Sequence, residues 1–180
     1  MFCYLLFCWW RFYRKKGKVE KLKDKSAIPY PTQKADHIIR WGLSNKKSLA
    51  EISMENEMCW LDKEKIISSL DKIWETMLNS IFLGCQTDGE LSGGLNVKGR
   101  AKLLNNCLLG DSIYGSKYEW MDLIKNQNHE LDFVTNWVNC FALAVNEVNA
   151  SHGKIVIAPT IGAAGVIPAF LMYYLCFKKK

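Results

Sequence analysis

Four small residues in the last fifth of the chain mark a place where a ligand could approach the backbone closely. Gly162, Ala163, Ala164 and Gly165 stand between the β-branched run 155–157 and an apolar stretch typical of a helix. The first backbone N–H groups of a helix have no helical partner, so small side chains there leave room for an anion or a carboxylate. A tight turn in which glycine only relieves crowding fits the same pattern, because a short glycine motif is weak evidence of a site.

Side chains that could hold a metal ion are numerous but scattered. The three histidines stand far apart, and no two cysteines are separated by two residues, so neither a zinc site nor a disulfide framework is indicated. Most of the cysteines fall in apolar helical patterns, where cysteine is usually a small buried side chain. A reducing, cytoplasmic environment fits this usage best. The seven cysteines are Cys3, Cys8, Cys59, Cys85, Cys107, Cys140 and Cys176.

A buried helix is expected shortly before the small residues. Its apolar positions recur every three or four residues and are Phe133, Val134, Trp137, Val138, Phe141, Leu143 and Val145. Its end is polar, with Asn146, Glu147 and Asn149, which could serve a site or simply cap and hydrogen-bond within the fold. Residues 155–157 then predict a short extended segment before the last helix.

The chain between residues 29 and 128 predicts further helices. A short helix is expected over residues 35–43, and a second begins with Ser48, whose pairing with Glu51 makes a capping box. A long helix follows Asp62, and Gly84 is placed to end it.

Two connections complete this organisation. Residues 86–99 contain four glycines, too many for a helix interior, and predict a glycine-rich loop. A short helix is expected over residues 101–109, and residues 110–128 predict an irregular polar connection. The whole pattern predicts an all-α, multi-helix partial domain of about six helices.

The first 28 residues differ in composition from the rest. Residues 1–10 are apolar but reach only half the roughly 20 residues of a membrane span. Basic residues follow the apolar run instead of preceding it, which argues against a secretory signal. The segment could be a weak membrane anchor or an unrelated leader. The stiff Pro29-Tyr30-Pro31 segment predicts that a leader and linker over residues 1–28 give way to one domain over residues 29–180.

The formal net charge of +6 does not indicate a nucleic-acid partner. Residues 11–25 hold eight Lys or Arg against two acids, and residues 178–180 are three lysines. These two segments carry +9, so the rest of the chain carries −3. A nucleic-acid-binding protein needs its basic surface on the folded domain, where several phosphates can be neutralised together. We therefore expect no nucleic-acid binding.

Two motifs near the end of the chain resemble the signature of the iron–sulfur L-serine dehydratases, also called L-serine ammonia-lyases. AVNEVNA is similar to AVNEENA, and APTIGAAG, at the family's distance from it, is similar to APTNGACG. TDGELSGGLNVKGRA resembles the family's glycine-rich loop. The resemblance covers about residues 29–174, the first half of the family's α domain. The family's β domain and the cysteine-rich second half are not recognisable, so we expect an incomplete gene product.

The resemblance implies a reaction and a cofactor. L-serine would lose water, and the resulting enamine would be hydrolysed to pyruvate and ammonia. A four-iron, four-sulfur (4Fe–4S) cluster held by three cysteines would act as Lewis acid on the serine hydroxyl. One ligand is the cysteine of APTNGACG, and Ala164 stands in its place here. The other two ligands would lie beyond residue 180. We therefore expect that the chain alone binds no cluster and is inactive.

The resemblance also implies roles for several residues. Thr160, Gly162 and Ala163 match the substrate-binding turn, and the polar helix end with Asn146, Glu147 and Asn149 matches the part that packs behind it. Lys98 and Arg100 could meet the carboxylate of L-serine, or could be solvated residues that open a helix. The implied partners are L-serine and a missing half-domain, β domain or subunit. The alternative is a non-catalytic helical remnant or interaction protein, which the N-terminus could hold at a membrane.

Overall fold

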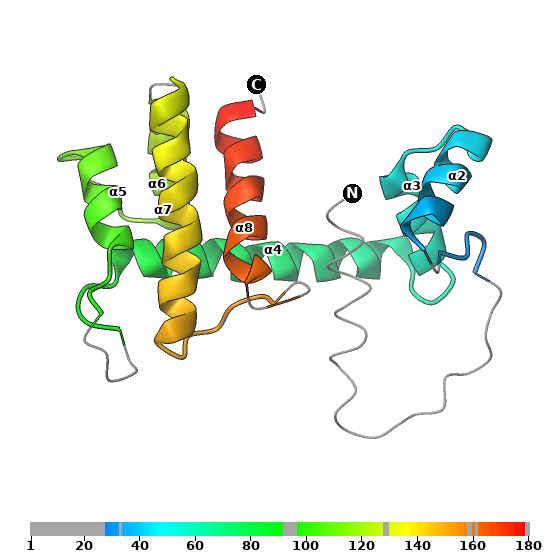
Figure 1. Ribbon diagram of the computed structural model, residues 1–180, viewed down its shortest axis with the longest axis horizontal. Helices are drawn as coiled ribbons and strands as arrows, with labels where there is room; N and C mark the ends of the chain where they lie inside the picture. The colour runs from blue at the N-terminus through cyan, green and yellow to red at the C-terminus, as the bar shows by residue number, and fades with distance from the viewer. Residues whose placement is uncertain are drawn as a thin grey trace. The chain divides into compact units, whose positions relative to one another are not determined.

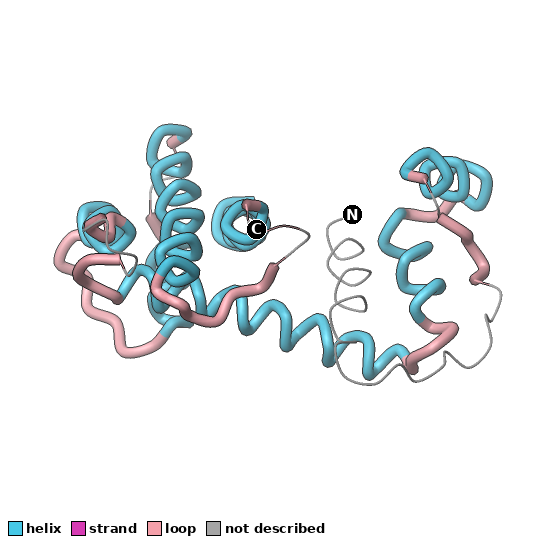
Figure 2. The backbone as a smooth tube through the Cα atoms, turned by 60° about the horizontal axis from the view of Figure 1, so that its bottom comes forward, coloured by secondary structure: helices cyan, strands magenta, loops and turns pink. Residues whose placement is uncertain are grey.

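The computed structural model describes residues 28–32, 34–91, 97–127, 130–157, 160 and 162–178. The predicted all-α class is confirmed, since the regular structure of these ranges is helical apart from one isolated antiparallel bridge between Glu90 and Lys98 (Figure 2). The helices are α2 (Ala35–Asn45), α3 (Leu49–Glu57), α4 (Lys63–Gln86), α5 (Ala101–Leu109), α6 (Lys117–Lys125), α7 (Leu131–Ala150) and α8 (Ala163–Tyr173), the last continued by a π-helix, η1 (Tyr174–Lys178).

The predicted leader and linker lie outside the described residues except for Ile28. In the described ranges, no helix is both long and apolar enough to span a bilayer. The chain divides into two compact units, residues 1–72 and 73–180, and the boundary falls inside α4.

The first unit is organised by polar contacts around α3. Ser48 and Glu51 form the predicted capping box, in which each side chain accepts a hydrogen bond from the other residue's backbone N–H. The Tyr30 backbone N–H donates to Asn56 Oδ1 at 3.0 Å, and Asn56 Nδ2 donates back to the Tyr30 carbonyl at 2.9 Å. This exchange fixes the segment before α2 onto α3.

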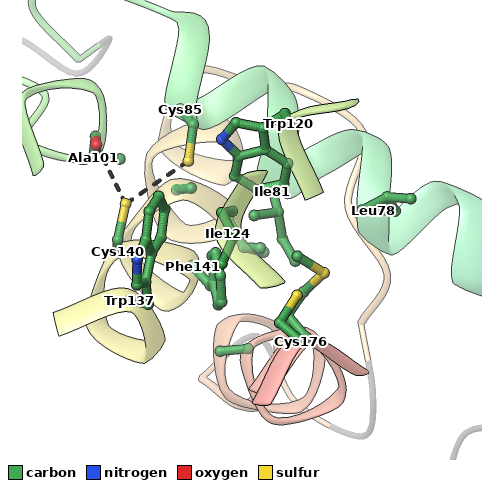
Figure 3. Close-up of a cluster of buried hydrophobic side chains, with 14 of the residues drawn as sticks. Leu78, Ile81, Cys85, Ala101, Trp120, Ile124, Trp137, Cys140, Phe141 and Cys176 are labelled. Carbon is green, nitrogen blue, oxygen red and sulfur yellow. Dashed lines mark hydrogen bonds between the residues drawn. The ribbon is translucent and has the colours of Figure 1, made fainter. Parts of the chain in front are cut away.

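The second unit is built around α7. This helix packs between α5 and α8, which lie on either side of it (Figure 1). Trp137 and Phe141 on α7 are fully buried and stacked with 5.4 Å between ring centroids, and Trp120 of α6 meets both edge-on. Figure 3 shows these rings together with Cys85 and Cys140 in one apolar cluster. Burial of large aromatic side chains supplies much of the stability of such a core.

The prediction that Gly84 ends the long helix is wrong. α4 continues through this residue to Gln86. At Gly84 the backbone of α7 comes so close that an added Cβ would lie 2.3 Å from the Ala144 carbonyl oxygen. Gly84 is therefore a helix-crossing residue, where the missing side chain lets two backbones approach.

The prediction of an irregular connection over residues 110–128 is also wrong, because α6 lies within it. Ser116 caps this helix by accepting a hydrogen bond from the Glu119 backbone N–H. The helix has nine residues, of which only Trp120 and Ile124 are buried, so most of its sequence is polar or exposed. The Trp120 indole N–H donates to the buried Asn105 Oδ1 at 2.8 Å, which fixes α6 against α5.

Candidate functional site

The Glu147 carboxylate connects the polar end of α7 to the beginning of α5. Its Oε1 accepts a hydrogen bond from the Arg100 backbone N–H at 2.7 Å, and both oxygens accept from the Ala101 N–H at 3.3 and 3.2 Å. These N–H groups have no partner within α5, and the helix N-terminus favours a negative charge. Glu147 is only 9% exposed. It therefore caps a helix that precedes it by more than forty residues.

Gly99 makes room for this contact. A Cβ at this position would lie 3.2 Å from Glu147 Oε2, which is tighter than an ordinary van der Waals contact. The glycine at the end of the predicted loop thus allows the carboxylate to reach the backbone of the next two residues.

Replacement of Glu147 by alanine is expected to lower the free energy of unfolding by about 1–3 kcal/mol, because two backbone N–H groups lose their acceptor near a buried site. Glu147→Gln keeps an acceptor but not the charge, so the loss should be smaller. Urea unfolding followed by circular dichroism measures both, with Asp111→Ala in an exposed turn as the control. An unchanged midpoint for Glu147→Ala would show that the cap does not stabilise the unit.

A groove of about 380 Å³ lies between α5 and α7, and we call it the asparagine groove. Arg100 and Leu104 line it from the α5 side. Its lining on α7 is Asn136, Asn139, Ala142, Leu143 and Asn146. Two residues singled out from the sequence, Arg100 and Asn146, therefore share one groove although they are 46 positions apart.

The start of α8 packs against the same part of α7. The Ala163 backbone N–H donates to Thr160 Oγ1 at 3.3 Å, so this hydroxyl holds the first turn of α8. At Gly165 an added Cβ would lie 2.9 Å from the Ala142 carbonyl oxygen and 3.1 Å from Asn146 Oδ1. The small residues thus allow close packing of α8 on the polar end of α7.

The remaining site residues from the sequence lie around these contacts. Lys98 is exposed, takes part in the bridge with Glu90 and does not line the asparagine groove. Gly162 is exposed and Ala163 half-buried at the start of α8. Asn149 is half-buried, and its backbone carbonyl accepts a hydrogen bond from the His152 N–H.

Asn136 and Asn139 were missed by the sequence reasoning. They precede Asn146 by ten and seven residues, a spacing that places all three on one face of α7. The repetition of asparagine on one face of α7 is the signal that could have identified the groove. A second, smaller cavity of about 110 Å³ is lined by Glu147, Gly99 and other residues around the loop before α5.

The described residues do not fit a four-iron cluster. Ala164, at the position of the family's cysteine ligand, is 1% exposed, and its methyl group cannot coordinate iron. No three His, Cys, Asp or Glu side chains of the described ranges gather as metal ligands do. Their donor set therefore gives no cluster site.

The buried cysteines belong to the core instead. Cys85 and Cys140 point toward one another with 3.8 Å between their sulfur atoms (Figure 3). The hydrogen bond with Cys140, together with burial, raises the pKa of the Cys85 thiol well above its ordinary value. Burial also raises the pKa of Cys176 to about 12. All three side chains pack in the apolar cluster of the second unit.

In the described part of the second unit, the residues just before α5, the polar end of α7 and the small-residue start of α8 come together. Residues 44–180 match the family model described as serine dehydratase alpha chain, and the chain belongs to this family.

Three curated relatives show the extent of the similarity. The chain is 38% identical over 158 residues to the L-serine dehydratase of Haemophilus influenzae, covering 88% of this chain and 31% of that protein. It is 36% identical over 151 residues to L-serine dehydratase 1 of Escherichia coli, covering 84% and 30%. It is 37% identical over 147 residues to L-serine dehydratase 2 of the same organism, covering 82% and 30%. The chain thus spans about three tenths of the length of these relatives.

Proposed function

We propose that this chain binds L-serine as part of an L-serine ammonia-lyase, the enzyme that converts L-serine to pyruvate and ammonia. The observation that supports this most is the capture of the Arg100 and Ala101 backbone by Glu147. It brings the residue after the glycine-rich loop beside the polar end of α7, so that Arg100 and Asn146 line one groove. The three relatives above carry the name L-serine dehydratase, which supports L-serine as the substrate.

In this proposal Arg100 holds the substrate carboxylate. A guanidinium group can donate two parallel hydrogen bonds to a carboxylate, which fixes both position and orientation. Lys98 and the turn with Thr160, Gly162 and Ala163 are proposed to complete the substrate site, a role that the family resemblance implies for them. Both Glu147 oxygens already accept backbone hydrogen bonds, so we assign Glu147 a positioning role together with Asn146 and Asn149.

The proposal of L-serine as the substrate does not extend to a cofactor bound by this chain. The family resemblance implies a 4Fe–4S cluster, but Ala164 and the buried thiols do not provide its ligands. We therefore propose that this chain by itself holds L-serine without dehydrating it, and that activity requires ligands from elsewhere, in a further half-domain or a β domain or subunit. We also propose a cytoplasmic location, which the five free cysteines of the described ranges support, and a domain boundary at residue 29.

The test is a calorimetric titration of the full-length chain with L-serine. We expect saturable binding that Arg100→Ala weakens about tenfold or more, because a hydrogen bond to a charged group contributes about 1.5–3 kcal/mol. Arg40→Ala, which removes an exposed arginine of α2, is the matched control and should bind like the wild type. Pyruvate should not form. Absence of L-serine binding by the wild type would contradict the proposed function.

A further inference from the structure

The asparagine groove combines exposed polar side chains with apolar walls. α5 and α7 pack against each other, and Leu104 and Leu143 contribute apolar surface to the walls. Asn136, Asn139 and Asn146 occupy one exposed face of α7 and form the polar wall of the groove. Asparagine stabilises a helix interior less than alanine or leucine does, so this arrangement does not help α7 to form.

The polar groups of the groove are available to a ligand. Within the described ranges, the side chains of Arg100, Asn136, Asn139 and Asn146 make no hydrogen bond or ion pair with the protein. Each asparagine offers two N–H donors and one oxygen acceptor, and Arg100 offers N–H donors only. The Glu147 carboxylate, next to Asn146 in the chain, accepts hydrogen bonds from backbone N–H groups at the start of α5. It makes no ion pair with the Arg100 guanidinium. The lining thus combines one positive charge with several neutral donors and acceptors.

This combination selects a type of ligand. A single guanidinium matches a singly charged carboxylate, whereas a phosphate dianion would favour further positive charges. The asparagine oxygens can accept from an ammonium or a hydroxyl group, and the asparagine N–H groups can donate to a hydroxyl oxygen. The volume of about 380 Å³ suits a small molecule.

We propose that the asparagine groove binds a small molecule with one carboxylate and an adjacent hydroxyl or ammonium group, and that Asn136 and Asn139 recognise this second group. The inference rests on the proposed function in that L-serine carries all three groups. It adds two specificity-determining residues to the site. Arg100 then anchors the carboxylate at the α5 side, and the asparagines discriminate between ligands along α7.

The test uses full-length chain labelled with ¹⁵N at asparagine, whose side-chain amide signals are followed by NMR. The probes are L-serine, 3-hydroxypropionate, which lacks the ammonium group, and ethanolamine, which lacks the carboxylate. We expect L-serine and 3-hydroxypropionate to shift the signals of Asn136 and Asn139, and ethanolamine to leave them unchanged. Asn136→Ala and Asn139→Ala should each weaken the binding of L-serine about tenfold. Asn45→Ala on α2 should leave this affinity unchanged. The two groove asparagines are exposed, and backbone amide spectra of the variants check that they fold.

The outcomes separate this inference from the proposed function. If L-serine binds and both groove variants bind it as well as the wild type, the groove assignment is wrong and the proposed function stands. If only 3-hydroxypropionate binds, with dependence on Asn136 and Asn139, the groove assignment is supported and L-serine is not the ligand. If no probe binds, both are wrong.

Discussion

A chimera that continues this chain beyond Lys180 with the remainder of L-serine dehydratase 1 of Escherichia coli is expected to make pyruvate only when Ala164 is replaced by cysteine. The family resemblance implies a cluster with one ligand at the position of residue 164 and two ligands in the added part. A positioned Lewis acid contributes several kcal/mol to stabilising the leaving hydroxide. Each 1.4 kcal/mol is about tenfold in rate, so the two chimeras should differ about a thousandfold or more.

The assay is pyruvate release from L-serine under anaerobic conditions, with iron and sulfide supplied. Ala150→Cys in the same chimera is the control, since a cysteine at the end of α7 should not restore activity. Ala164→Cys in the chain without the added part should also stay inactive, because two ligands are still missing. Equal rates for the chimeras with Ala164 and with the cysteine would disprove the assignment of this position.

Replacement of Gly84 by alanine is expected to lower the free energy of unfolding of the second unit by about 3 kcal/mol or more. The added Cβ would lie 2.3 Å from the Ala144 carbonyl oxygen and 2.6 Å from its carbonyl carbon, so two helix backbones must separate. Overpacking usually costs about 1–3 kcal/mol and more where the backbone has to move. Domains are stable by only about 5–15 kcal/mol, so this loss is a large share of the total.

The expected change in the free energy of unfolding has the opposite sign to the change that helix propensity predicts. By helix propensity alone, alanine in place of a glycine inside α4 should stabilise the chain by about 1 kcal/mol. Urea unfolding followed by tryptophan fluorescence reports on the second unit, because Trp120 and Trp137 are fully buried there. Gly115→Ala is the control, since its Cβ would meet only Glu119 Oε2 at an ordinary 3.5 Å. A midpoint for Gly84→Ala at or above that of the wild type would refute the close-crossing interpretation.

Local chemistry made several elements predictable from the sequence alone. The capping box of Ser48 and Glu51 involves groups three residues apart, so the start of α3 could be identified without any tertiary contact. The bounds of α5 agree with the expected helix over residues 101–109. The apolar period of α7 predicted its buried face correctly, since Trp137, Phe141 and Val145 are fully buried. Each of these features depends on neighbours within a few turns of one helix.

Other features were decided only by contacts between distant parts of the chain. Gly84 has the sequence pattern of a helix end, and only the approach of α7 shows that it is a crossing point. α6 is short and mostly polar, and its position depends on the burial of Trp120 and on the hydrogen bond from Trp120 to Asn105. The polar end of α7 could have been a local cap. In the tertiary structure Glu147 instead caps the start of α5. The first N–H groups of that helix have no partner within the helix, and they lie within hydrogen-bond distance of the Glu147 carboxylate.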